Sequence, residues 1–135
     1  MEIRLAKTAG FCFGVDRAVK LTYDLLADGH KVATLGPLIH NPQVVEDLEA
    51  KGALTCPDVA SVPDGYEVII RSHGVPRTIY DTLEQRGLVY HDATCPFVQK
   101  IQRIAAQAEK EGAVLLVAGD KTHPEVQGIV GHTRG

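Results

Sequence analysis

The sequence predicts an α/β fold in which a parallel sheet is flanked by helices. Short apolar runs alternate along the chain with segments whose apolar residues recur at the helical period. The links between these segments are short and rich in glycine and proline. Strand–helix alternation of this kind is typical of parallel sheets whose faces are covered by helices. The 135 residues are enough to bury a hydrophobic core, and no low-complexity linker divides them.

Five apolar runs are expected to be strands, and four segments with helical periodicity are expected to be helices between them. The strands are residues 3–6, 32–35, 66–70, 88–90 and 114–118, and the helices are residues 15–26, 42–51, 76–86 and 96–111. Asn41 is a good N-cap and Pro42 a good first residue for the second helix. A glycine follows each helix closely, as expected at helix C-termini. The turn signal Pro63-Asp64-Gly65 leads into the third strand.

Composition excludes several classes of partner. The formal net charge is −3, and aromatic residues make up 5% of the chain, which predicts no nucleic-acid partner and no anionic membrane surface. No apolar run approaches the length of a membrane span, and the N-terminus lacks the pattern of a signal peptide, so a cytoplasmic protein is expected. Three widely spaced cysteines do not form a secreted disulfide framework and are expected to be thiols or metal ligands.

Histidine and cysteine gather where the predicted strands are followed by helices. The five junctions carry, in order, Cys12, His40, His73, Cys95 and His123. The carboxyl ends of parallel strands are the usual place for ligand sites, so these residues are expected to converge on one crevice. Imidazoles and helix N-termini together favour an anion such as a diphosphate. Two thiolates in the same place indicate a metal centre beside that anion.

Spacing alone leaves several alternatives open. Cys12 lies between Gly10 and Gly14 at a predicted helix start, where a thiol is activated, but a buried cysteine beside turn glycines fits equally well. Glu125 is either a carboxylate favoured by the helix dipole or a proton donor at the anion site. Cys56 is expected to be a lone thiol outside the site. Three histidines lack a comparable context and are expected to be structural or surface residues, namely His30, His91 and His132.

Five motifs occur in an order that resembles one known family. They are Gly10-Phe11-Cys12-Phe13-Gly14-Val15-Asp16-Arg17-Ala18, Ile39-His40-Asn41-Pro42, Ser72-His73-Gly74-Val75, Asp92-Ala93-Thr94-Cys95-Pro96 and His123-Pro124-Glu125-Val126. Together they resemble the N-terminal part of the LytB/IspH family of 4-hydroxy-3-methylbut-2-enyl diphosphate reductases. The resemblance implies an iron–sulfur oxidoreductase of the non-mevalonate isoprenoid pathway. Such an enzyme removes the hydroxyl of its allylic diphosphate substrate reductively, giving isopentenyl and dimethylallyl diphosphates.

The resemblance also implies the roles of individual residues. The cluster would be of the 4Fe-4S type, and the electron donor would be reduced ferredoxin or flavodoxin. The implied cluster ligands are Cys12 and Cys95, the implied diphosphate contacts are His40, His73 and His123, and the implied proton donor is Glu125.

The family architecture implies a pseudo-threefold trefoil of α/β lobes. Residues 1–95 are expected to form the first lobe and residues 96–135 the start of a second. The family's cluster needs a third cysteine, but none follows Cys95, and family members are considerably longer. We therefore expect an N-terminal fragment whose activity belongs to the complete protein. The alternatives are a non-catalytic α/β module that binds a phosphorylated ligand or a metal through its histidines, and a cysteine hydrolase.

Overall fold

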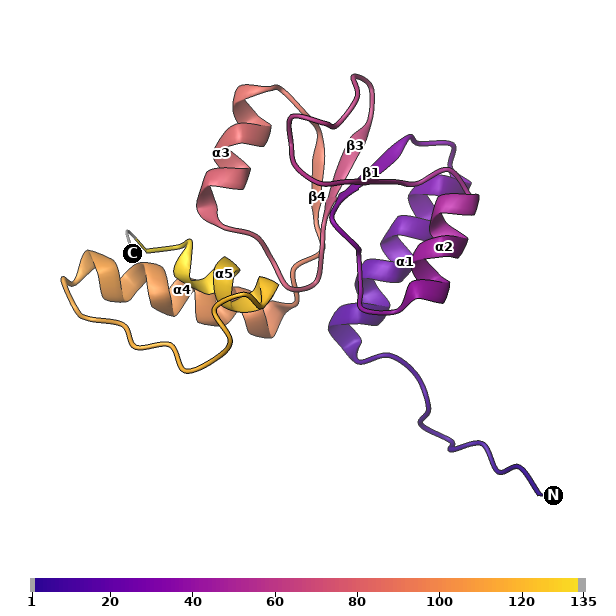
Figure 1. The fold of residues 1–135 in the computed structure, drawn as a ribbon, viewed down its shortest axis with the longest axis horizontal. Helices are drawn as coiled ribbons and strands as arrows, with labels where there is room; N and C mark the ends of the chain where they lie inside the picture. The colour runs from indigo at the N-terminus through magenta and orange to yellow at the C-terminus, as the bar shows by residue number, and fades with distance from the viewer. Residues whose placement is uncertain (1, 134–135) are drawn as a thin grey trace.

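The computed structural model describes residues 2–133 and confirms the α/β class with a parallel sheet (Figure 1). The sheet has the strand order β2-β1-β3-β4, and every neighbouring pair is parallel. In chain order the elements are α1 (Phe13–Ala27), β1 (Val32–Leu35), α2 (Pro42–Ala50), β2 (Leu54–Cys56), β3 (Glu67–Ile70), α3 (Arg77–Gln85), β4 (Tyr90–Asp92), α4 (Pro96–Lys110) and α5 (Pro124–Val130).

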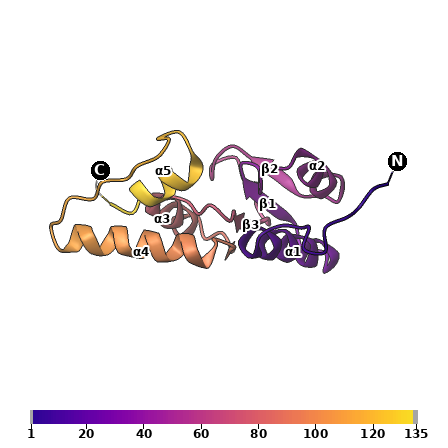
Figure 2. The ribbon, with the colours of Figure 1, turned by 90° about the horizontal axis from the view of Figure 1, so that it is seen from below.

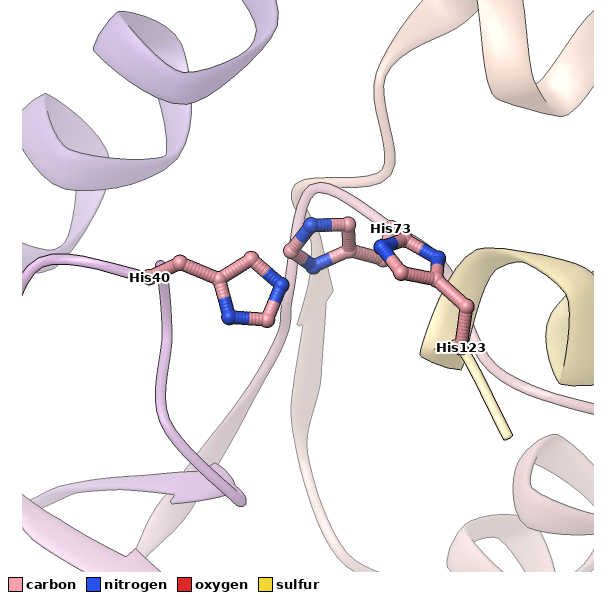
Figure 3. A group of neighbouring side chains, drawn as sticks. All are labelled: His40, His73 and His123. Carbon is pink, nitrogen blue, oxygen red and sulfur yellow. The ribbon is translucent and has the colours of Figure 1, made fainter. Parts of the chain in front are cut away.

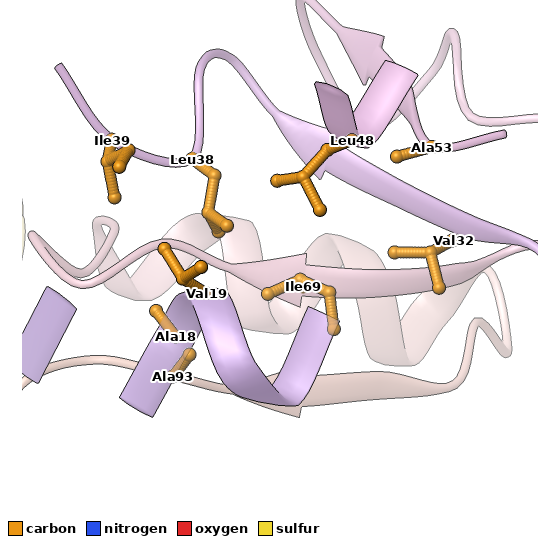
Figure 4. Close-up of a cluster of buried hydrophobic side chains, with 9 residues drawn as sticks. All are labelled: Ala18, Val19, Val32, Leu38, Ile39, Leu48, Ala53, Ile69 and Ala93. Carbon is orange, nitrogen blue, oxygen red and sulfur yellow. The ribbon is translucent and has the colours of Figure 1, made fainter. Parts of the chain in front are cut away.

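The two faces of the sheet bury two separate hydrophobic clusters, because successive strand residues point to opposite faces. In β3, Ile69 belongs to the cluster beneath α1 and α2, whereas Val68 and Ile70 belong to the cluster beneath α3. Figure 4 shows the first cluster, with Ile69 and Val32 facing side chains of α1 and α2. Ile69 is fully buried, and burial of a side chain of this size stabilises a fold by about 1.5–3 kcal/mol.

The last two helices lie together beyond the end of the sheet. In Figure 2, α4 and α5 lie to one side of the strands, and α1 and α2 lie to the other. The backbone N–H of Arg77 in α3 donates to the carbonyl of Gly131, which follows α5, at 3.1 Å. This bond ties the end of α5 to the start of α3. The division at residue 95 remains a prediction.

Two of the predicted strands are wrong. Residues 3–6 and 114–118 carry no strand, and their apolar side chains are exposed, with Leu5 87% and Leu116 89% accessible. Neither segment has a neighbouring strand among residues 2–133, so its backbone has no ladder partner and its side chains have no sheet face to cover. Both segments have the composition of a strand, but no strand among the described residues pairs with them.

One strand was missed. Residues 54–56 form β2, which pairs with β1 through Ala33↔Leu54 and Leu35↔Cys56. The segment is only three residues long and lies at the sheet edge, which leaves little sequence signal. Cys56 is buried, and its thiol lies 3.8 Å from the carbonyl oxygen of Ser61. The lone thiol expected from the sequence is thus a buried one, and its place outside the site stays a prediction.

Near the amino ends of the strands, one carboxylate bridges two histidines. Glu67 Oε1 lies 2.6 Å from His30 Nδ1, and Glu67 Oε2 lies 2.6 Å from His91 Nε2. The hydrogen bond from His91, followed by that from His30, lowers the pKa of Glu67 below its usual range. Two histidines that the sequence left without a role thus join β3 to β4 and to the end of the α1–β1 loop.

Glu67→Gln is expected to lower the unfolding free energy by about 1 kcal/mol at pH 7, the upper end for partly exposed ion pairs. A lowered carboxyl pKa contributes stability above the unfolded value of about 4.3, and this contribution is lost as the pH falls through the folded pKa. The part of the difference between wild type and variant that comes from the Glu67 charge should therefore shrink as the pH falls below about 4. Urea unfolding across this range measures it. The exposed Glu46→Gln serves as the control, and equal acid sensitivity of the two variants would contradict the prediction.

Candidate functional site: three histidines beside two cysteines

Three of the predicted site residues form one cluster. His40 follows β1, His73 follows β3, and His123 directly precedes α5. Their ring centroids are 4.7 Å apart for His40–His73, 5.9 Å for His40–His123 and 5.7 Å for His73–His123. One nitrogen of each ring lies within 4.8 Å of the others (Figure 3). The expected convergence of the strand–helix junctions is therefore found for the histidines, and we call these three residues the histidine cluster.

Local sequence fixes the loops that carry the cluster. Asn41 caps α2 by accepting a hydrogen bond from the Val44 backbone N–H at 3.2 Å, and Pro42 is the first helical residue. His40 is therefore held immediately before a rigid helix start. Gly74 adopts a φ of +72°, and its N–H donates to the carbonyl of Arg71 at 2.9 Å. This tight turn contains His73.

The environment of His73 keeps its ring neutral. Burial, followed by the charges of His40, Arg71 and His123, lowers the pKa of His73 to about 4. At pH 7 the ring therefore offers hydrogen bonds and carries no charge. Its Nδ1 is buried without a hydrogen-bond partner among the described residues. A neutral ring with an unsatisfied nitrogen is ready to bind a ligand.

The backbone of α5 sets the tautomer of His123. The Nδ1 of His123 accepts a hydrogen bond from the Glu125 backbone N–H at 3.2 Å, so this histidine acts as the N-cap of α5. A neutral imidazole that accepts at Nδ1 carries its proton on Nε2. His123 therefore presents an N–H donor, which suits an anionic oxygen. A metal ion would instead need the lone pair of that nitrogen.

Cys12 and Cys95 occupy equivalent positions at two helix N-termini. Cys12 is the N-cap residue of α1 and is exposed, and Cys95 is the N-cap residue of α4 and is half-buried. Both thiols therefore lie in the positive potential of a helix start. The first turn of α1 packs directly on Cys95, since a Cβ atom at Gly14 would lie 2.7 Å from the Cys95 sulfur.

Hydrogen bonds link the cysteine pair to the histidine cluster. The Cys95 backbone N–H donates to the carbonyl of Ser72, the residue before His73, at 2.9 Å. Arg17 in α1 donates to the carbonyls of Thr94 and Asp92 at 3.1 and 2.9 Å, which fastens α1 to the segment before Cys95. The structure thus brings Cys95 next to the His73 loop, and α1 next to Cys95.

These residues fit an iron–sulfur cluster in part. Two thiols at adjoining helix starts, with a glycine where a side chain would overlap the sulfur, are suited to a group that binds thiolates. The third cysteine of the chain is Cys56, which lies in the hydrophobic cluster on the α3 face of the sheet. The structure therefore places two of the three cysteines at this site and the third on another face of the sheet.

Glu125 lies in the first turn of α5, two residues after His123. Its backbone N–H donates to the ring of that histidine, as described above, so the backbone of Glu125 is fixed beside the histidine cluster. The carboxylate forms no ion pair among the described residues. Both readings of Glu125 left open by the sequence are compatible with this position.

Sequence reasoning missed two residues that border the histidine cluster, Arg71 and Gln102. Arg71 directly follows β3 and is a half-buried cation. Gln102 in α4 is buried, and its Nε2 is buried without a hydrogen-bond partner among the described residues, close to Gly74 and Gly128. A cation directly after a run of buried strand residues is a usable sequence signal. A buried glutamine on an amphipathic helix has no such signal.

The LytB protein family model matches residues 3–135. This chain belongs to the LytB protein family. The family expected from the five motifs is thereby confirmed.

Curated relatives of this LytB chain are named 4-hydroxy-3-methylbut-2-enyl diphosphate reductase. The protein from Geobacter sp. (strain M21) is 48% identical over 135 residues, covering 100% of this chain and 48% of the relative. The protein from Clostridioides difficile (strain 630) is 45% identical over 132 residues, covering 97% of this chain and 47% of the relative. The chain thus spans about half the length of the curated relatives it matches.

Two solved structures share the fold. A structure of (E)-4-hydroxy-3-methyl-but-2-enyl diphosphate reductase, the terminal enzyme of the non-mevalonate pathway, matches with a TM-score of 0.81 and 44% identity, covering 96% of this chain and 46% of that one. The Plasmodium falciparum reductase matches with a TM-score of 0.87 and 31% identity, covering 93% and 40%. No helix among the described residues is long and apolar enough to cross a membrane.

Proposed function

We propose that this chain carries the diphosphate-binding part, and two of the cluster ligands, of a 4-hydroxy-3-methylbut-2-enyl diphosphate reductase. The observation that carries the proposal is the convergence of three histidines from three separate junctions, with their nitrogens within 4.8 Å of one another. The substrate is an allylic diphosphate, and the electron donor is reduced ferredoxin or flavodoxin. The cytoplasmic location that the family implies remains a prediction.

In this proposal the histidine cluster binds the diphosphate through N–H donors. His123 donates from Nε2, because its Nδ1 accepts from the start of α5. His73 contributes a neutral ring, and His40 reaches the anion from the exposed end of the β1 loop. Fixed donors aimed at one place bind phosphate oxygens without reorganisation when the ligand arrives.

The remaining residues act on the other end of the substrate. Cys12 and Cys95 would hold the iron–sulfur cluster, which would pass two electrons from the reduced donor to the substrate for removal of the allylic hydroxyl. The reaction consumes two protons. Glu125 would supply one to the departing hydroxyl, which leaves as water, and the second is added to the allylic carbon to give either alkene product. The position of Glu125 in the first turn of α5, two residues after His123, supports this role.

A metal-binding module is the alternative that one observation favours, since the cluster nitrogens are close enough together to hold an ion. The His123 tautomer argues against it, because an Nε2–H donates to an anion and has no free lone pair for a metal.

Anaerobic reconstitution with iron and sulfide tests the ligand assignment. We expect visible sulfide-to-iron absorption in wild type and Cys56→Ala, and its loss in Cys12→Ala and Cys95→Ala, with an exogenous thiol completing the coordination. Iron and acid-labile sulfide per chain measure the outcome. Colour that persists in Cys12→Ala, or that disappears in Cys56→Ala, would overturn the assignment. Stoichiometric zinc without labile sulfide would favour the metal-binding module.

A further inference from the structure

Among residues 2–133, Arg71 is a cation without a carboxylate partner. It stands at the end of β3, two residues before His73, and is half-buried. Its Nε is buried and has no hydrogen-bond partner among the described residues. None of the ion pairs among these residues includes it. A half-buried guanidinium that lacks both a carboxylate and a hydrogen bond at Nε destabilises the fold unless a ligand compensates it.

The guanidinium lies between the two loops that carry His73 and His40. Its backbone carbonyl closes the turn containing His73 by accepting from the Gly74 N–H. Its Nη1 lies 3.2 Å from the position that a Cβ atom would take at Gly36, in the loop that leads to His40. Gly36 has a φ of +72°, and no side chain at this position separates the loop from the guanidinium.

A histidine ring carries no permanent positive charge, whereas the guanidinium of Arg71 does. His73 is neutral at pH 7, partly because the charge of Arg71 disfavours its protonation. Burial lowers the pKa of Arg71 from a starting value so high that the guanidinium stays charged at every physiological pH. A diphosphate carries several negative charges, and neutral hydrogen-bond donors alone offset them poorly.

We propose that Arg71 supplies the fixed positive charge for the anion bound by the histidine cluster. This inference rests on the proposed diphosphate site and adds a residue to it. Arg71 pairs electrostatically with the diphosphate from its place between the two loops that carry His73 and His40. The same charge adds to the burial and to the charge of His40 that together disfavour protonation of His73.

Titration calorimetry with inorganic pyrophosphate, in a buffer with a chelator, tests the inference on the full 135-residue chain. Arg71→Met is expected to weaken binding at least about tenfold, the effect of losing one charge-assisted contact. Arg71→Lys, which keeps the charge, is expected to retain binding to within about threefold. Arg103→Met removes the same charge from the exposed side of α4 and should bind as wild type.

Nuclear magnetic resonance provides measurements that should stay unchanged if Arg71 has only a structural role. In Arg71→Met the pKa of His73 should rise from about 4 toward its ordinary value. In the wild-type chain the Arg71 Nε–H signal should shift on addition of pyrophosphate, while that of Arg103 stays in place. The measurement on the wild-type chain tests the inference even if the Arg71→Met variant does not fold.

The outcomes separate the two proposals. If the wild-type chain does not bind pyrophosphate, the proposed diphosphate site fails. If it binds, but Arg71→Met binds equally well or the Arg71 signal of the wild type does not shift, the inference about Arg71 is overturned and the diphosphate site stands.

Discussion

Gly74→Ala is expected to lower the unfolding free energy by about 2–5 kcal/mol and to abolish pyrophosphate binding. Two effects add. Gly74 has a φ of +72°, a conformation that costs a side-chain-bearing residue about 1–2 kcal/mol. The new methyl group would also overlap the buried amide of Gln102 and lie 3.0 Å from the Thr94 Cγ2 atom, and overpacking of this kind typically costs about 1–3 kcal/mol. The displaced turn is the one that contains His73.

Gly29→Ala is the matched control for the backbone effect. Gly29 has a φ of +85°, but a Cβ atom there would meet nothing within 4 Å. Its variant should therefore lose about 1–2 kcal/mol and keep pyrophosphate binding. In the double variant Gly74→Ala/Gln102→Ala the overlap is removed, so part of the stability should return. Equal losses in Gly74→Ala and Gly29→Ala, measured by urea unfolding, would show that Gln102 does not constrain the turn.

Gly14→Ala is expected to prevent the joint use of Cys12 and Cys95 as iron ligands. Within a helix, alanine is normally favoured over glycine by about 0.5–1 kcal/mol. Here the methyl group would lie 2.7 Å from the Cys95 sulfur and 2.8 Å from its Cβ, and relief of that overlap must move α1 away from α4. We expect a net loss of about 1–2 kcal/mol in stability and a fall in bound iron after reconstitution to the level of Cys12→Ala.

Gly131→Ala provides the control for Gly14→Ala. A Cβ atom at Gly131 would lie 2.8 Å from the Cα of Pro76, so this variant suffers a comparable overlap away from both cysteines. It should lose stability and keep its iron. Full iron incorporation in Gly14→Ala would mean that the two thiols tolerate separation, and that the packing of α1 on Cys95 is not a requirement for the cluster.

The sequence was sufficient for the sheet and for the histidine cluster because both depend on local signals. Apolar runs indicated β1 and β3, and proline and glycine residues indicated where the neighbouring helices begin and end. The His40 and His73 junctions could be placed together because the parallel strands β1 and β3 end at one edge. His123 was expected there after a strand at residues 114–118, but it reaches the cluster from the start of α5. Each signal is carried by a few neighbouring residues.

The failures all concern interactions that are distant in sequence. Residues 3–6 have the composition of a strand, but whether they pair depends on a neighbour that is not among the described residues. The edge strand β2 is made by its register with β1 and has little pattern of its own. Arg71 and Gln102 border the site because they lie close to glycines in other loops. The sequence alone does not reveal these contacts.

The short helix α5 depends on neighbouring elements for its stability, and a ligand bound by the histidine cluster would stabilise it further. Seven residues are too few to be helical on their own, so α5 depends on its packing against α4 and on the bond from Arg77. An anion bound by His123 together with His40 and His73 would link α5 to the loops at the carboxyl edge of the sheet. By mass action, a ligand at 100 times its dissociation constant raises the free energy of unfolding by about 2.7 kcal/mol. In this chain the substrate anion would thus serve as a removable cross-link between the sheet and the last helix.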